Sequence, residues 1–453
     1  MPVDALKLEI EKTSTAIKLF PYSSGYGGGE NSRAACVIIS LQNFSCVCNL
    51  FGRAVASEFL LGVIQSLRSL GGDEILRARV RPDLDGVIEV LFASSRPDCN
   101  RFVHACCVAL ATTPIDVLGV SLLPALSFAC QSSCSDFEEV GGVEGRGVSH
   151  PPHGVLEVAR THREASYSAS GQAGAYRADM LASAVLLKAV RTNSAQLAWQ
   201  PVCHSDDRFG VLYQEGAIHA VDPSGGTPCL NDQILAVERI GAAPVLDCYT
   251  VSRAIDQLRA SSQVFIGVVI SSLSATQSFW WNEIFSDLSA DRSIAARLFI
   301  EIRATAPFPP FGEVVAFVDR MRRLGCRIIL GDFGIGFSSI RSLIALRPDG
   351  IKIDAFLLHR ALRGDEERAV FLSLARLAAT LASTVIVRGV DTAEQAQVAN
   401  EAGVVWQQGE YHGRPSVSRR WPGESPDHSY SAQWPQRTRK AQLSSIEELT
   451  EWR

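Results

Sequence analysis

The sequence predicts an α/β fold in which a C-terminal (β/α)8 TIM-like barrel follows a smaller α+β domain. Strand and helix patterns alternate over roughly 220 residues of the second half, as expected for a parallel sheet that closes into a barrel. Three of these strands carry charged residues at or near their ends, namely Asp332, Lys352 and Arg388. The chain has 453 residues, which is enough for two or three domains. We therefore expect the charged strand ends to meet at one rim of the barrel.

The first half alternates less regularly and includes an antiparallel hairpin. The expected elements are a strand at 36–41, a helix at 54–70, strands at 75–80 and 87–92 around a turn at 81–86, a helix at 98–111, a strand at 120–130 and a helix at 154–169. The predicted divisions are a flexible lead at 1–34, a first domain at 35–174 with an exposed loop at 131–152, a barrel at 177–417 and a polar tail at 418–453.

The barrel begins with a helix at 177–190. Its strands are expected near 196–202, 211–217, 264–270, 298–302, 327–330, 350–353, 384–387 and 404–406. Periodic apolar residues predict helices at 312–324, 366–382 and 393–402. After the strand at 327–330, a glycine-rich turn carries Asp332, and Ser338 or Ser339 is expected to cap the next helix.

The composition indicates a cytoplasmic protein. A net charge of −5 without charge blocks predicts no nucleic-acid partner, because such a partner requires a basic face. The first residues lack the basic and apolar regions of a signal peptide, and no apolar run reaches the roughly 18–20 residues of a membrane span. The 12 cysteines lack the spacing of a zinc site and are interpreted as small apolar residues.

The charged rim alone leaves its chemistry open. Glu301, Asp332, Lys352, Arg388 and Asp391 could bind phosphate, a divalent metal ion, or both. Alternatively, each charge caps a strand or pairs with a neighbour. Function is favoured for the set because barrel rims carry active sites.

The order of motifs resembles the EAL domain family, which hydrolyses or binds the bacterial second messenger cyclic di-GMP. The family's "DDFGTG", "KID", "EGVET" and "QGY" motifs match residues 331–336, 352–354, 388–392 and 408–411, followed by Arg414 and Pro415. Upstream, residues 199–202 resemble its "YQPI" strand and residues 238–241 its "AExxG" helix. The resemblance covers roughly residues 177–417 and implies the family's barrel.

Several family positions that imply metal binding and catalysis differ here. The signature Glu-Ala-Leu appears as Glu215-Gly216-Ala217, and the arginine that follows it is His219. Metal-ligand positions of the family are occupied by Ser272, Gly331 and Arg388, and the last glutamate of the "ELTE" motif by Ala304. The remnants of the catalytic site are Glu215, Glu301, Asp332 and Lys352. We expect no metal, no cofactor and no catalytic residue.

The first domain resembles the GGDEF family of diguanylate cyclases. Its "DxDxFKxxND" segment corresponds to residues 40–49, which contain neither aspartate. A literal Gly-Gly-Asp-Glu-Ile at 71–75 is interpreted as a helix end and turn, because the family's signature lies at a hairpin tip, here at 81–86. The resemblance therefore implies a degenerate domain without cyclase activity.

We expect a catalytically silent cyclic di-GMP signalling protein that acts as a nucleotide receptor or regulatory adaptor. Arg388 and Lys352 would contact the phosphates, and Gln200, Gln408 and Pro415 would line the guanine pockets, with Pro201, Glu215 and Asp332 completing the set. One alternative is an interaction scaffold that no longer binds nucleotide, and a second is residual phosphodiesterase activity. The protein partner is unknown, and the resemblance predicts a homodimer through the barrel.

Overall fold

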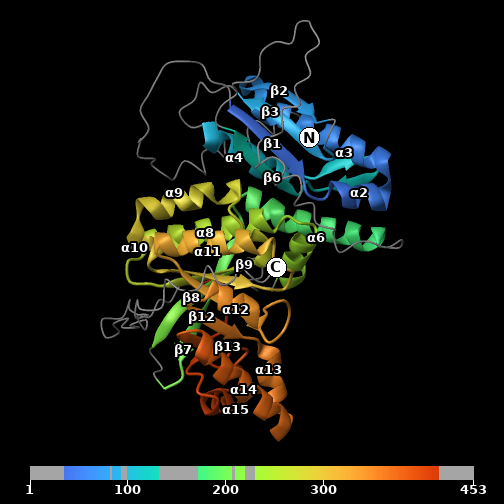
Figure 1. Ribbon diagram of the computed structural model, residues 1–453. Coiled ribbons are helices and arrows are strands. Elements are labelled where there is room, and N and C mark those ends of the chain that lie inside the picture. The colour runs from blue at the N-terminus through green and yellow to red at the C-terminus, as the bar shows by residue number, and fades with distance from the viewer. Residues whose placement is uncertain are drawn as a thin grey trace, which may run out of the picture.

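The computed structural model describes residues 35–81, 84–92, 99–131, 172–206, 210–219 and 230–417. These residues form an antiparallel sheet with helices and a closed barrel, which Figure 1 shows one above the other. The predicted lead at 1–34, the loop at 131–152 except Gln131, the helix at 154–169 and the tail at 418–453 lie outside the described residues. Every described helix is too short or too polar to span a lipid bilayer.

The first sheet has four strands in the order β2-β3-β1-β6, and each neighbouring pair is antiparallel. The strands are β1 Ala35–Leu41, β2 Ile75–Val80, β3 Val87–Phe92 and β6 Leu126–Gln131. The predicted hairpin, β2 and β3, is confirmed. The predicted helices are also found, as α3 Arg53–Gly71 and α4 Cys99–Ala111.

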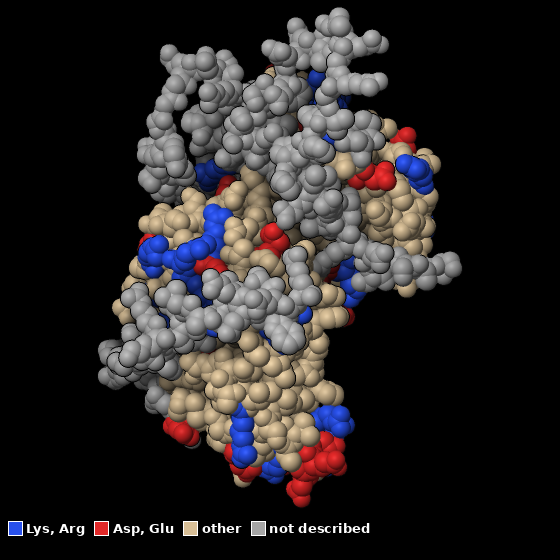
Figure 2. Space-filling model, in the orientation of Figure 1, with Lys and Arg blue, Asp and Glu red and all other residues tan. Residues whose placement is uncertain are grey.

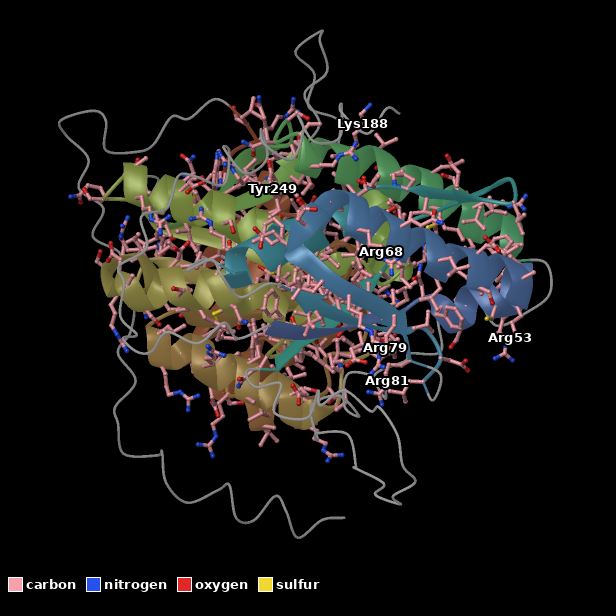
Figure 3. The ribbon with its side chains drawn as sticks, turned by 90° about the horizontal axis from the view of Figure 1, so that it is seen from above. Arg53, Arg68, Arg79, Arg81, Lys188 and Tyr249 are labelled. Carbon is pink, nitrogen blue, oxygen red and sulfur yellow. The ribbon has the colours of Figure 1, made fainter. Side chains whose placement is uncertain are left out.

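Figure 3 labels Arg68, which belongs to α3, and Arg79, which belongs to β2. Arg68 donates to the backbone oxygen of Ala78 at 3.1 Å. Arg79 donates through Nε to Glu89 of β3 at 2.7 Å. These contacts tie α3 to β2 and β2 to β3.

The literal Gly-Gly-Asp-Glu-Ile segment is a helix end, as predicted. Helix α3 continues to Gly71, one residue further than expected, and Gly72 has φ of 52°. A 3-10 turn, η2 Gly72–Glu74, then leads into β2. Glycine tolerates this positive φ without the steric cost of a side chain.

Two features of the first domain were not predicted. Helix α2 Phe44–Phe51 precedes α3, and the strand expected at 120–130 is divided into β5 Val120–Leu122 and β6, with β5 paired to β4 Ile115–Val117. The division lies at Pro124, which has no N–H for a ladder. The buried Asn43 amide bonds Leu123 O at 2.9 Å and Ala125 N at 3.2 Å, satisfying the backbone at the break.

The second sheet is a closed barrel in the order β10-β11-β12-β13-β14-β7-β8-β9. Its strands are β7 Gln196–His204, β8 Val211–His219, β9 Ile266–Ser271, β10 Leu298–Arg303, β11 Arg327–Phe333, β12 Gly350–Ile353, β13 Thr384–Arg388 and β14 Trp406–Gln408. A closed barrel is therefore confirmed. An entirely parallel sheet is wrong, because β7 is antiparallel to both β8 and β14. The connection from His204 to Val211 is too short for the helical crossover that parallel neighbours need.

Helices surround the barrel (Figure 1). They are α6 Ala173–Arg191, α7 Asn231–Arg239, α8 Ala243–Ala260, α9 Asn282–Ala290, α10 Arg292–Ala295, α11 Phe311–Leu324, α12 Ile340–Leu346, α13 Ala355–Ala361, α14 Asp365–Leu381 and α15 Ala393–Glu401. Ser339 caps α12 by accepting from Ser342 N, as predicted. Tyr249 of α8, labelled in Figure 3, donates to Ala195 O at 3.0 Å, just before β7. On the face shown in Figure 2, charges of both signs lie in separate groups.

Buried side chains, most of them aromatic, connect the first domain to the barrel. Trp280 is 2% exposed, donates from Nε1 to Leu126 O of β6 at 3.0 Å, and its ring centroid lies 4.5 Å from that of Phe128. On the other side, Asn43 Nδ2 donates to the Tyr176 hydroxyl of α6 at 3.1 Å. The first domain therefore rests on the barrel through buried contacts.

We expect Trp280→Ala to destabilise the protein by about 3–5 kcal/mol, because it removes a buried ring and creates a cavity between the domains. The measurement is the urea unfolding midpoint followed by tryptophan fluorescence and circular dichroism. Trp280→Phe is the control, since it keeps an aromatic ring and loses only the hydrogen bond to Leu126, worth about 1 kcal/mol. Equal midpoints for Trp280→Ala and wild type would contradict this interface.

Candidate functional site

The inner part of the candidate site is a buried cluster of one lysine and two glutamates. Lys352 of β12 pairs through Nζ with Glu215 of β8, and lies 2.5 Å from Glu301 Oε2 of β10. Lys352 is 1% exposed and Glu301 is 3% exposed. Below this cluster Tyr213 and Phe299 stack with ring centroids 4.7 Å apart, so the ionic cluster lies on an aromatic floor inside the barrel.

Burial and pairing act in opposite directions on these groups. Burial raises the pKa of Glu301 to about 7, and the neighbouring Lys352 offsets only part of that effect. For Glu215, burial is the largest single effect and would raise the pKa, but the charge and hydrogen bonding of Lys352 together with the other polar neighbours lower the pKa below its usual value. Burial alone would lower the pKa of Lys352, but the two glutamates raise it well above its usual value. Lys352 is therefore charged, and its charge is balanced by Glu215 and Glu301.

Glycine at position 331 leaves space that Glu301 fills. A Cβ atom at Gly331 would lie 2.5 Å from Glu301 Oε1, which is closer than side chains approach. Glu301 can bend toward Lys352 because residue 331 has no side chain. The glycine at position 331 therefore makes room for the Glu301 side chain that pairs with Lys352.

The outer part of the site is an arginine between two aspartates. Arg388 Nη2 lies 2.6 Å from Asp354 Oδ2, and Arg388 Nη1 lies 3.5 Å from Asp332 Oδ1. The Arg388 side chain is 39% exposed, whereas those of Asp332 and Asp354 are almost fully buried. Burial raises the pKa of Asp332, and Arg388 opposes that shift.

The backbone positions Asp332 by a distortion of β11. The pairing of β11 with β12 shifts register between Leu330 and Phe333, and Asp332 has φ of 52°. Such an irregularity redirects a side chain at a barrel rim. Asp332 therefore belongs to the end of a strand rather than to the glycine-rich turn predicted from the sequence.

Three other positions that differ from the family pattern are buried. Ser272 is fully buried and its hydroxyl donates to Ala306 O at 2.8 Å. His219, at the end of β8, is 7% exposed. Ala304 is fully buried and its carbonyl accepts from Phe337 N at 2.9 Å. All three residues are therefore buried within the packed wall of the barrel.

The expected guanine-pocket residues lie beside the inner cluster. Gln200 of β7 is the antiparallel partner of Glu215, and its Nε2 donates to Gly413 O at 3.0 Å. Gln408 is 3% exposed and lies beside Glu215. Pro415 lies in the closing segment, where the next residue, Ser416, pairs with Trp199. Pro201 packs near Gly413 in the same region, so these predicted residues are brought to one side of the mouth.

The residues present do not fit a divalent metal site. Hard cations need several convergent oxygen ligands, and both glutamates here hold a lysine ammonium instead. The described residues contain no group of three acidic, histidine or cysteine side chains arranged to hold a metal ion. Arg388 adds positive charge where a further ligand would be needed.

Two residues of the mouth were missed by the sequence reasoning. Asp354 pairs with Arg388 and also caps α13 by accepting a hydrogen bond from Phe356 N at 2.8 Å. Its position directly after the strand that carries Lys352 could have indicated a place at the rim. Arg303 ends β10 two residues after Glu301, and its spacing on an alternating strand was the available signal.

The fold and this site define a barrel whose mouth carries buried ion pairs instead of an assembled metal centre. The EAL domain family matches residues 183–415. The chain therefore belongs to the EAL domain family, which confirms the resemblance found in the sequence.

Curated relatives share this part of the chain. The oxygen sensor protein DosP of Escherichia coli (strain K12) is 25% identical over 250 residues, covering 54% of this chain and 31% of DosP. The cyclic di-GMP phosphodiesterase NbdA of Pseudomonas aeruginosa is 23% identical over 236 residues, covering 51% of this chain and 30% of NbdA. The match thus spans about a third of the length of these relatives.

Solved structures are similar at lower identity. A PaMucR phosphodiesterase in complex with c-di-GMP is 20% identical, covering 51% of this chain and 95% of that chain, with a TM-score of 0.46. The S helix-GGDEF-EAL structure of LapD from Vibrio cholerae is 17% identical, covering 84% of this chain and 90% of that chain, with a TM-score of 0.48. At these values the likeness says nothing about the ligand of this chain.

Proposed function

We propose that this protein is a catalytically silent cyclic di-GMP signalling protein whose barrel binds the nucleotide without metal and acts as a receptor or regulatory adaptor. Membership of the EAL domain family supports the ligand class, since relatives such as NbdA are named as cyclic di-GMP phosphodiesterases. The observation that carries the proposal is the pairing of Lys352 with both Glu215 and Glu301. These carboxylates are occupied by an internal cation, so hydrolysis through metal ions has no site.

Arg388 supports binding of the nucleotide. Its guanidinium is partly exposed at the mouth, and its 3.5 Å contact with Asp332 is looser than its 2.6 Å contact with Asp354. A phosphate oxygen can replace the weaker contact while the stronger one keeps Arg388 in place. Guanidinium binds phosphate oxygens in pairs and supplies positive charge without a metal ion.

We propose that the first domain is a degenerate GGDEF-like domain. Its antiparallel sheet and the hairpin of β2 and β3 are compatible with that family, and residues 84–86 stand at the hairpin tip where the signature is expected. Phosphoryl transfer needs metal ions and a phosphate cradle. Residues 40–49 supply no acidic side chain for such a centre, so a structural role beside the barrel follows.

A second reading is an interaction scaffold that has lost the nucleotide. Four apolar side chains near α12 and α13 are about half exposed: Phe337, Ile340, Ile344 and Phe356. They favour contact with a protein, including the homodimer expected from the family resemblance. The replacement of the family's arginine by His219 also favours this reading, and the titration below separates it from the receptor.

We expect micromolar cyclic di-GMP to give binding heat in isothermal titration, equally in EDTA and in Mg²⁺, because no metal takes part in binding. We also expect no linear pGpG on incubation with Mn²⁺. A flat titration in both buffers would favour the scaffold. Formation of pGpG that disappears in Glu215→Ala would instead establish residual phosphodiesterase activity.

A further inference from the structure

Arg303 stands at the mouth of the barrel and is not used by the contacts described so far. On β10, Phe299 stacks on Tyr213 and Glu301 pairs with Lys352 inside the barrel. Alternate residues of a strand face the same side. Arg303 is the next member of this inward series, and as the last residue of β10 it reaches the rim.

Asp332 lies between Arg303 and Arg388. The strands follow one another as β10, β11, β12 and β13; Arg303 ends β10, Arg388 ends β13, and Asp332 is the last residue but one of β11. Burial raises the pKa of Asp332, and the charges of Arg388 and Arg303 both oppose that shift. The buried Asp332 carboxylate therefore contacts Arg388 directly, while Arg303 acts on it through its charge.

Arg303 has hydrogen-bonding capacity left over. Its Nε atom is buried and makes no hydrogen bond, and within the described residues its guanidinium forms no ion pair. Asp247, the other acid that its charge influences, already accepts a hydrogen bond from Ser271 N at 2.9 Å. Arg303 is not needed to neutralise Asp247 by direct contact. A buried donor without a partner costs free energy that a ligand can recover.

We propose that Arg303 and Arg388 together form a two-guanidinium clamp for phosphodiester oxygens at the barrel mouth, with Asp332 of β11, the strand next to β10, in contact with Arg388. This inference rests on the proposed function, since cyclic di-GMP supplies the phosphodiesters. Each guanidinium offers paired N–H donors that match phosphate oxygens. The clamp replaces the positive charge that metal ions would otherwise supply.

The test is isothermal titration of the full chain with cyclic di-GMP, comparing wild type with Arg303→Gln and Arg303→Lys. Arg376→Gln is the matched control, because Arg376 is exposed on α14 on the outside of the barrel. We expect at least a tenfold weaker affinity for Arg303→Gln, a smaller loss for Arg303→Lys, and no change for the control. Wild-type affinity in Arg303→Gln would overturn the clamp and leave the proposed function standing. Arg303→Lys answers the question if Arg303→Gln does not fold, since retained wild-type affinity in it would overturn paired donation by Arg303.

A second probe separates failure of the clamp from failure of the proposed function. Inorganic pyrophosphate is expected to raise the thermal unfolding midpoint of wild type and of the control, but not of Arg303→Gln. If cyclic di-GMP does not bind while pyrophosphate behaves in this way, the anion clamp is retained and the nucleotide function is lost. If pyrophosphate stabilises all variants equally, the clamp is overturned.

Discussion

Replacing Lys352 by methionine is expected to destabilise the protein by about 3–5 kcal/mol at pH 8, because breaking a buried ion pair leaves unpaired charge in the interior. Lys352 is 1% exposed, and its ammonium serves two carboxylates at once. Methionine has similar length and no charge. The free energy of unfolding from urea titration measures the loss.

The control is the triple variant Lys352→Met, Glu215→Gln, Glu301→Gln, which removes all three charges and keeps the side-chain shapes. It is expected to recover most of the lost stability, because neutral side chains of matched volume avoid the cost of burying ions. A loss below about 1 kcal/mol in the single variant, the upper range of an exposed pair, would show that the cluster is open to water.

The pH dependence gives an independent reading of the same cluster. The pKa of Glu301 is raised from 4.5 to about 7 in the folded protein. The folded state therefore binds a proton more tightly than the unfolded chain, and this contribution to stability is complete below pH 4.5 and lost as pH rises through 7. In Lys352→Met, the pKa of Glu301 is expected to rise further, because the neighbouring positive charge is gone. Glu301 is then protonated at a higher pH, so the variant should regain stability as the pH is lowered.

Sequence pattern was sufficient for most strands and for closure of the barrel, because apolar runs and their spacing are local. It did not give the direction of β7, although the short connection after His204 was visible. The division at Pro124 was also readable, but the Asn43 amide that satisfies the broken backbone comes from residues about 80 positions away. Long-range hydrogen bonds of this kind have no local signature.

The site shows the same limit more sharply. The family resemblance predicts that Gly331 and Arg388 stand at metal-ligand positions, but it does not say what the remaining charged groups do. Only closure of the barrel brings β8, β10 and β12 together, so that Lys352 takes both glutamates and Glu301 fills the space beside Gly331. Whether Gln200, Gln408 and Pro415 contact a guanine base stays a prediction.

Arg388→Lys is expected to weaken cyclic di-GMP binding by about 10–100-fold, or 1.4–2.7 kcal/mol, while changing stability little. Lysine keeps a positive charge near Asp354 and Asp332, so the two buried carboxylates still have a counter-charge. It loses the planar pair of N–H donors that recognises phosphate oxygens. Titration calorimetry gives the affinity, and urea unfolding checks the fold.

Arg388→Ala tests the other half of this argument. It removes the charge as well, so the two carboxylates lose their common partner, and both affinity and stability should fall. If Arg388→Lys binds like wild type, the arginine contributes charge alone, and paired donation to phosphate is wrong. If both variants bind like wild type, the nucleotide does not meet Arg388, and the contacts of Asp332 and Asp354 with it are purely structural.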